Sequence, residues 1–288
     1  MERELWKVLY VLTKKLDRPG GRWLYSDADV LVVYYWAVAH DRPTVWATDS
    51  RNWPRGLRPL HFPSQSTLSR RLRQPGVVAL LMAVEEELVA LTDVGCCLAC
   101  ILDGKALAVS GVSKDPDATY GRGAGKKQKG YKLHAVWGRG PIPLAWALAP
   151  MNTSEKTIAR LLIPTLPGGG YLLVDTQYDV NALYDLAAKA GFQLIAEKRK
   201  GGLGHRRQSP GRLRSIELLK TNFGRELYCQ RNAIETRFGT MVCTGGGLGP
   251  LPAWVRRFPR VRNWIQAKLL VIAVRWLKLQ EPETLAVA

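Results

Sequence analysis

The stretch LACILD, residues 98–103, is a continuous apolar run that ends in a carboxylate, and YLLVD, residues 171–175, repeats that pattern. Short apolar runs of this kind are typical of strands that are buried on both faces of a sheet. A side chain at the end of such a strand lies at the rim of the sheet, where α/β proteins bind ligands. Each aspartate on its own is equally explained as the start of a turn. Two matching instances favour a functional role for Asp103 and Asp175.

The chain around these two runs has the pattern of a mixed α/β sheet with flanking helices. Apolar segments broken by Gly and Pro predict strands at 97–103, 105–110, 131–137, 142–149, 171–175 and 192–196. Helices are expected at 154–162, at 179–190 with Asp179 as the cap, and at 212–241. We expect the terminal amphipathic helix, 261–279, to pack on the sheet.

Residues 1–95 have helical periodicity instead, and we place a domain boundary between this region and residues 96–288. Leu5, Trp6, Leu9 and Leu12 share one helix face. Ser26 is placed to cap a helix that continues to about His40, and 77–91 predict another helix.

The segment 63–73, PSQSTLSRRLR, predicts a short basic helix that Ser64 caps. Leu68 and Leu72 form its apolar side. The outward side chains are Gln65, Ser66, Ser69, Arg70 and Arg73. Amide, hydroxyl and guanidinium groups contact base edges and phosphates in helix-turn-helix proteins, so this helix is a candidate DNA contact. A basic surface helix without a role in a DNA groove remains the alternative.

Charge supports a polyanionic partner. The 288 residues carry a net charge of +18, and the excess lies in three stretches, 42–80, 114–139 and 197–262. Clustered Arg and Lys are typical of a surface that follows DNA phosphates, although solvated faces of a basic protein are the alternative. Lys126, Lys127 and Lys129 belong to a Gly-rich segment, 121–130, which we expect to be a loop that contacts phosphates.

Five cysteines and no secretory leader indicate a cytoplasmic protein without a disulfide framework. The most apolar late segment, 269–274, is too short to cross a membrane. No membrane partner is expected.

A third carboxylate belongs to the predicted helix at 212–241. At about 100° per residue, Tyr228, Arg231 and Glu235 lie on one face of that helix. Such an alignment also arises by chance on a solvated helix, so it carries weight only together with the two aspartates.

These residues resemble the DDE transposases of bacterial insertion sequences, in the group with the signature Y-x2-R-x3-E-x6-K. The resemblance spans roughly 97–280. It rests on Asp103 followed by Gly-Lys, on Asp175-Thr-Gln-Tyr178, and on the triplet Tyr228, Arg231 and Glu235. The signature lysine falls at Val242, which departs from the pattern.

The resemblance implies an RNase H-like, mixed five-stranded sheet whose Asp103, Asp175 and Glu235 hold two divalent ions, Mg²⁺ or Mn²⁺. Adjacent carboxylates repel one another, which agrees with a site for hard cations. By the same resemblance, Tyr228, Arg231 and Tyr178 contact DNA.

The implied function is a transposase that binds the terminal inverted repeats of a mobile element, cleaves the ends and joins the 3′-hydroxyls to target DNA. The implied partners are double-stranded DNA, from the element ends and the target, and a second copy of the chain on paired ends. The implied location is the bacterial cytoplasm, at the nucleoid. Two alternatives remain: a decayed or repurposed transposase that only binds DNA, which Val242 keeps open, and a general RNase H-like nuclease without strand transfer.

Overall fold

The structure is a computed structural model that describes residues 2–18, 24–91, 98–123, 125–199, 208–243, 247–248 and 251–280. The chain divides into two compact units. One unit contains Met1–Thr92 and Met241–Ala288, and the other contains Asp93–Thr240. The expected domain boundary between residues 95 and 96 lies outside the described residues.

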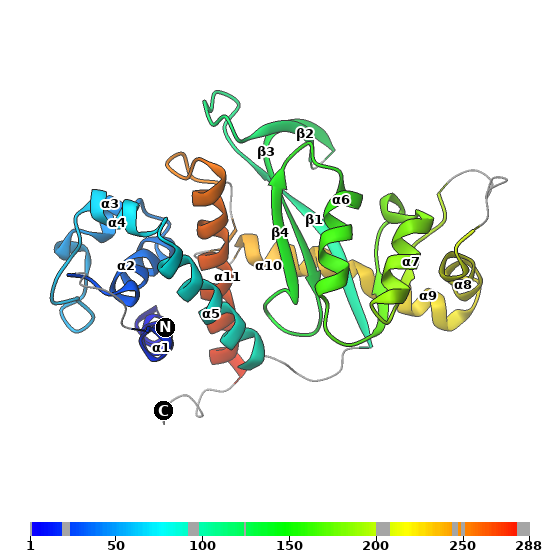
Figure 1. Ribbon diagram of the computed structural model, residues 1–288, viewed down its shortest axis with the longest axis horizontal. Helices are drawn as coiled ribbons and strands as arrows, with labels where there is room; N and C mark the ends of the chain where they lie inside the picture. The colour runs from blue at the N-terminus through cyan, green and yellow to red at the C-terminus, as the bar shows by residue number, and fades with distance from the viewer. Residues whose placement is uncertain are drawn as a thin grey trace. The chain divides into compact units, whose positions relative to one another are not determined.

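The unit Asp93–Thr240 is built on a curled, mixed sheet of six strands (Figure 1). The strands are β1 (Ala99–Ala108), β2 (Thr119–Gly123), β3 (Lys126–Trp137), β4 (Ala145–Pro150), β5 (Gly170–Leu173) and β6 (Phe192–Ile195). Their order is β2-β3-β1-β5-β6, and β4 also pairs with β3. β1 is antiparallel to β3 and parallel to β5, which is parallel to β6. This topology is consistent with an RNase H-like fold.

Two strand predictions need correction. The expected strands 97–103 and 105–110 are one strand, β1, which continues past Asp103 to Ala108. The expected loop 121–130 is a hairpin made by β2 and the start of β3, and β2 is a sixth strand in the sheet, for which the resemblance implied five. Gly and Lys are rare in strands, so side-chain pattern alone predicted a loop. Backbone hydrogen bonds form this ladder. Gly125 in the turn has a φ of 79°, a backbone conformation that residues with a side chain rarely adopt.

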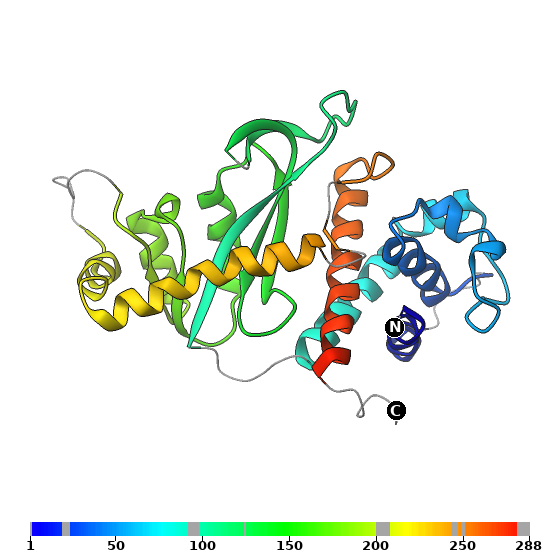
Figure 2. The ribbon, with the colours of Figure 1, turned by 180° about the vertical axis from the view of Figure 1, so that it is seen from behind.

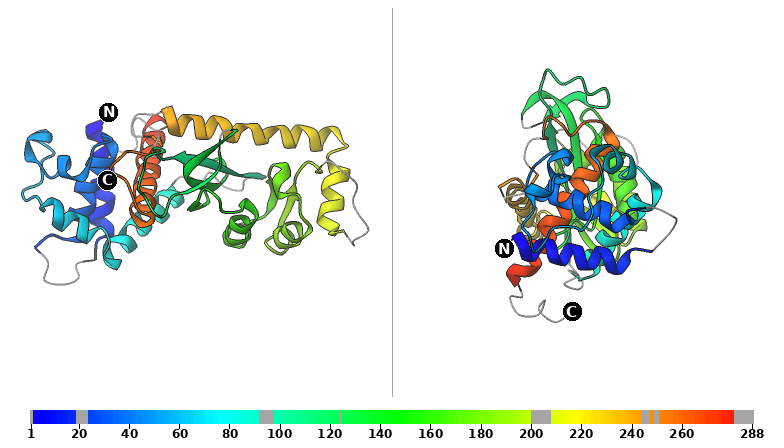
Figure 3. Two further views of the ribbon diagram at one scale, coloured as in Figure 1. Left: turned by 90° about the horizontal axis from the view of Figure 1, so that it is seen from above. Right: turned by 90° about the vertical axis from the view of Figure 1, so that its left-hand side faces the viewer.

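Helices cover both faces of the sheet. α6 (Glu155–Leu162) and α7 (Asn181–Lys189) pack on one face through a shared apolar core (Figure 1). α9 (Asn222–Cys229) and the first residues of α10 (Ala233–Cys243) run along the other face, where Phe238 meets Trp137 edge to face (Figures 2 and 3). The single helix expected at 212–241 is divided into α8 (Pro210–Leu218), α9 and α10, with a 3₁₀ turn at Gln230–Asn232.

Asp179 does not cap α7, contrary to expectation. The N-cap residue is Val180, and Asp179 instead forms a buried ion pair with Arg212 at 2.6 Å. Burial raises the pKa of Asp179, but the hydrogen bonds from Arg212 and from the Arg199 backbone N–H outweigh it and hold that pKa below its usual value. The ion pair therefore connects α8 to the segment that precedes α7.

The other unit is a helical bundle. Its helices are α1 (Glu2–Leu16), α2 (Asp27–Ala39), α3 (Thr44–Ala47), α4 (Gln65–Arg71), α5 (Pro75–Leu91) and α11 (Phe258–Gln280). α2 is the central helix, because its residues 30–38 are all buried. As predicted, Ser26 caps α2, and its hydroxyl accepts a hydrogen bond from the Asp29 N–H in a full capping box.

The C-terminal helix α11 packs against α1, α2 and α5, and not on the sheet as expected. Its residues 263–274 are all buried, the polar Asn263 and Gln266 among them, so this part of the helix is enclosed on every side. Lys268 lies in this buried stretch, where its Nζ donates to the Asp41 carboxylate and lies 5.2 Å from the centre of the Trp264 ring.

The ion pair between Lys268 and Asp41 yields a stability prediction. The Lys268 side chain is 1% exposed and that of Asp41 is 52% exposed. Replacing Asp41 with Asn, which tolerates the φ of 51° found there, leaves a buried ammonium without its counter-charge. We expect Asp41→Asn to lower the free energy of unfolding by about 1–3 kcal/mol in urea titrations, and Lys268→Met on that background to recover much of the loss.

The matched control is Glu217→Gln, which removes the partner of Lys220 in a pair that is 65% and 69% exposed. This change should cost about 0.5 kcal/mol or less. Equal losses in the two single variants would contradict the buried position of Lys268.

Candidate active site

The pairing of β1 with β5 brings the two aspartates together. Ile101 is the partner of Leu173 in this parallel ladder, so two residues further along Asp103 and Asp175 lie at the same level on neighbouring strands. Side chains alternate along a strand, so both carboxylates are on the sheet face that α9 and α10 cover. Asp103 lies within β1, and Asp175 lies two residues beyond Leu173, the last residue of β5.

Each carboxylate is held by a nearby backbone N–H. Asp103 Oδ1 accepts from Gly104 N at 2.7 Å, and Asp175 Oδ1 accepts from Gln177 N at 2.7 Å, which starts a 3₁₀ turn. Burial raises the pKa of Asp103 to about 6, and the negative charge of Asp175 adds to that rise. Burial also raises the pKa of Asp175. The pair is therefore electrostatically unfavourable when both carboxyls are ionised.

Tyr228 and Arg231 lie beside this pair. The Tyr228 hydroxyl donates to the carbonyl oxygen of Val174 at 3.0 Å, so it connects α9 to the residue before Asp175. The Arg231 guanidinium lies 5.7 Å from the centre of the Tyr228 ring, and its charge lowers the pKa of both aspartates. Arg231 Nε is buried and has no hydrogen-bond partner among the described residues. The two side chains thus position and partly neutralise the carboxylates.

Glu235 lies in the first turn of α10 and is exposed. Together with Asp103 it lines a hollow of about 1400 Å³. Within the part of the chain that the structure describes, no three acidic, His or Cys side chains are close enough to hold a metal ion together. Glu235 therefore shares the hollow with Asp103, but the three acids do not form a preassembled metal cluster.

A further acid, Glu155, borders the same hollow, and the sequence interpretation did not identify it. Its Oε1 accepts from Lys132 Nζ at 2.7 Å, and its negative charge contributes to the raised pKa values of Asp103 and Asp175. Acids are common in the first turn of a helix, as here in α6, so its position gave no distinctive pattern. His134 is fully buried near this ion pair, and burial lowers its pKa to about 4, so the imidazole is neutral.

The hairpin forms the basic rim of the hollow. Lys126 and Lys127 are exposed and line it, together with Arg122. Lys129 differs, because it is partly buried and its Nζ donates to the Ser113 carbonyl oxygen at 2.7 Å. The structure thus distinguishes three lysines that looked equivalent in the sequence.

Tyr178 is the one candidate DNA contact that the structure contradicts. Its side chain is 0% exposed and packs in the apolar core beneath α6 and α7. The resemblance had implied a DNA contact for Tyr178, but the 3₁₀ turn after Asp175 directs this ring inward. The Tyr178 ring is therefore part of the core and is not accessible to DNA in this structure.

In the helical unit, α4 follows the expected pattern. The Ser64 hydroxyl accepts from Thr67 N, and Leu68 and Leu72 are buried. The outward positions are exposed or half-buried: Gln65, Ser66, Ser69, Arg70 and Arg73. Arg71 is buried, where it pairs with Asp27 and the Tyr25 carbonyl oxygen. The five outward side chains therefore form a polar face on a fixed helix.

The crowded aspartates yield a second stability prediction. The pKa of Asp103 is raised above its unfolded value near 4, so ionisation opposes folding. This cost is absent below about pH 4, grows between about pH 4 and 6, and is complete above about pH 6. We expect Asp103→Asn to raise the free energy of unfolding by about 1–2 kcal/mol at pH 7.5 without divalent ions, and the gain to vanish towards pH 4 in urea titrations. A gain in the free energy of unfolding that does not depend on pH would show that the ionisation of Asp103 is not its cause.

A comparison with known families agrees with this geometry. A family model described as "Transposase DDE domain" matches residues 98–243, half of the chain. The match includes Asp103, Asp175 and the helices that carry Tyr228, Arg231 and Glu235. No curated protein matches the chain. The match to the family model shows that the chain belongs to the DDE transposases of the insertion-sequence type.

Proposed function

We propose that this protein is a metal-dependent transposase that binds the ends of a mobile DNA element, cleaves them and joins the 3′-hydroxyls to target DNA. The observation that carries this proposal is the placement of Asp103 and Asp175 at the same level on neighbouring strands, where Asp103 lines a hollow that Glu235 also lines. The basic hairpin at its rim supplies charge for the DNA backbone.

The donor set fits divalent ions. Carboxylate oxygens are the ligands that Mg²⁺ and Mn²⁺ prefer. Burial raises the pKa of Asp103, and the charges of Asp175 and Glu155 add to the rise, so a bound cation would stabilise the ionised carboxyl. Asp103 and Asp175 would hold the ions from the sheet, and Glu235 from α10. When bound, a pair of such ions activates the attacking oxygen and stabilises the leaving oxygen of an in-line displacement at phosphorus.

The chain's own side chains position the DNA strand. Tyr228 fixes α9 against the end of β5, and Arg231 places a guanidinium beside the carboxylates, where a scissile phosphate would gain a charge-assisted contact. Lys126 and Lys127 extend the cationic surface along the rim. The polar face of α4 would contact the terminal repeats in double-stranded DNA.

Two copies of the chain would bring paired ends together, in the bacterial nucleoid. No helix among the described residues is long and apolar enough to cross a membrane.

The carboxylates provide the central test. We expect Asp103→Ala, Asp175→Ala and Glu235→Ala each to reduce Mn²⁺-dependent nicking of supercoiled plasmid by about 100-fold or more, because each removes a charge that holds the ions. Fluorescence anisotropy should show DNA binding in all three. The matched control is Glu226→Ala, which removes an exposed acid from α9 and should nick normally.

Nicking by any of the three alanine variants at the wild-type rate would contradict the assignment of that residue. DNA binding without nicking by the wild-type chain would favour the alternative of a decayed transposase. The exposed Val242 in the last turn of α10 would then be the first residue to change, as Val242→Lys.

The hairpin lysines yield a prediction about salt dependence. Each phosphate that a lysine neutralises contributes about 0.9 to the slope of log K against log salt. We expect Lys126→Gln and Lys127→Gln each to reduce the slope by about 0.9, as measured by anisotropy with a labelled duplex. Lys129→Gln is the control and should change it less, because Lys129 is bonded to Ser113. An equal change in all three slopes would contradict the distinction that the structure makes.

A further inference from the structure

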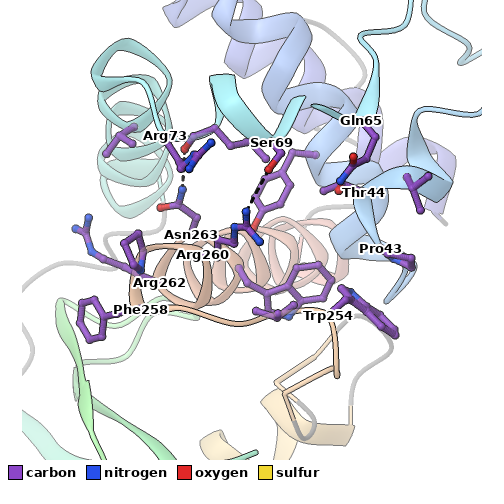
Figure 4. A pocket seen from close by; sticks show the side chains of 17 residues that line it. Pro43, Thr44, Gln65, Ser69, Arg73, Trp254, Phe258, Arg260, Arg262 and Asn263 are labelled. Carbon is purple, nitrogen blue, oxygen red and sulfur yellow. Dashed lines mark hydrogen bonds between the residues drawn. The ribbon is translucent and has the colours of Figure 1, made fainter. Parts of the chain in front are cut away.

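A pocket in the helical unit has no role in the activity proposed above. It has a volume of about 570 Å³ and lies between α4 and the N-terminal end of α11 (Figure 4). This volume is within the range of sites for small molecules, about 300–1000 Å³. The pocket lies beside the polar face of α4, since Gln65, Ser69 and Arg73 line it.

Aromatic rings form much of the wall. The Trp254 indole is 45% exposed, an unusual exposure for so large an apolar side chain, and Phe258 at the start of α11 is half-buried. Deeper in the pocket, Tyr34 and Trp264 are buried and contact each other edge to face at 6.4 Å. Exposed aromatic rings at the mouth of a pocket are the surfaces on which nucleobases stack in single-stranded DNA complexes.

The charged residues of the pocket are all cationic. Arg73, Arg260 and Arg262 line it, and none of the described side chains in its wall is acidic. Arg260 Nη2 contacts Ser69 Oγ at 3.4 Å, so one guanidinium bridges α11 and α4. A ligand that complements this wall carries negative charge, as a phosphodiester does.

The wall is held in place by a buried hydrogen bond. Asn263 Nδ2 donates to the Leu72 carbonyl oxygen at 3.0 Å, which joins α11 to the end of α4. Asn263 and Leu72 are both buried. This hydrogen bond therefore fixes the two helices that form the pocket wall relative to each other. The amide of Gln65 is exposed and available to contact a base edge.

We propose that this pocket holds one unstacked nucleotide of the DNA that α4 contacts, with its base against Trp254 and its phosphate against Arg73 and Arg260. The inference rests on the proposed DNA binding by α4 and adds a ligand class and a second group of contacts. Flat aromatic walls favour a base over an acidic side chain, and the three guanidinium groups favour a nucleotide over an apolar peptide. A base enters such a pocket most readily where it is already unpaired.

The test compares two labelled duplexes in anisotropy titrations, one fully paired and one with a single bulged thymidine. We expect the wild-type chain to bind the bulged duplex about tenfold more tightly, because one base–aromatic stack would form with the bulged duplex and not with the paired one. In Trp254→Ala the ratio of the two affinities should fall to about one. The matched control is Tyr10→Ala, an exposed aromatic of α1 outside the pocket, which should keep the wild-type ratio.

A 5-iodouracil in place of the bulged thymidine gives a second readout. On irradiation it should cross-link to the tryptic peptide 238–256, which contains Trp254. Binding of both duplexes with a wild-type ratio of one and no cross-link would overturn the pocket assignment and leave the proposed DNA binding intact. Failure to bind either duplex would overturn both proposals. If Trp254→Ala instead converts a dimer to a monomer and keeps the ratio, the pocket is an interface between copies and the nucleotide proposal is wrong.

Discussion

The parallel pairing of β1 with β5 is the constraint on which the site depends. It places Asp103 and Asp175 at the same level, although they are far apart in the sequence. Burial and mutual repulsion oppose this arrangement, as the raised pKa of Asp103 shows. The apolar residues that precede each aspartate, Leu102 and Val174 among them, are buried against α6 and α7 and supply the compensating free energy. The core of the sheet thus stabilises a pair of charges that would separate in a less rigid fold.

Counter-charges around the site moderate this repulsion without removing it. Arg231 lowers the pKa of both aspartates from one side, and Lys132 engages Glu155 nearby. Because Arg231 is held by α9 through its contact with Tyr228, the electrostatic balance depends on how α9 sits on the sheet. The structure therefore places acidic side chains beside a basic hairpin, which is the separation of charge that the proposed phosphoryl transfer on DNA requires.

Local patterns predicted the parts of this structure that local interactions determine. The apolar runs before Asp103 and Asp175 gave the central strands, and Ser26, Ser64 and Ser154 begin the expected helices. The sequence interpretation was wrong where pairing or burial depends on distant residues. The Gly- and Lys-rich hairpin is a strand pair because of backbone hydrogen bonds to a neighbour, which side-chain periodicity does not report. Tyr178 is buried because it packs against residues from other elements, such as Leu102 of β1 and Ile158 of α6.

In the helical unit, too, local sequence patterns do not predict contacts between residues that are far apart in the chain. Leu72 and Asn263 are 191 residues apart in the chain, yet one buried hydrogen bond joins them. An amphipathic pattern in α11 predicts that the helix packs, but it does not identify the surface on which it packs. Because α11 returns to α1, α2 and α5, the wall beside α4 includes residues from both ends of the chain. A basic helix near the start of the sequence and an exposed tryptophan near its end become one surface only through that packing, and for that reason neither segment alone predicts the pocket.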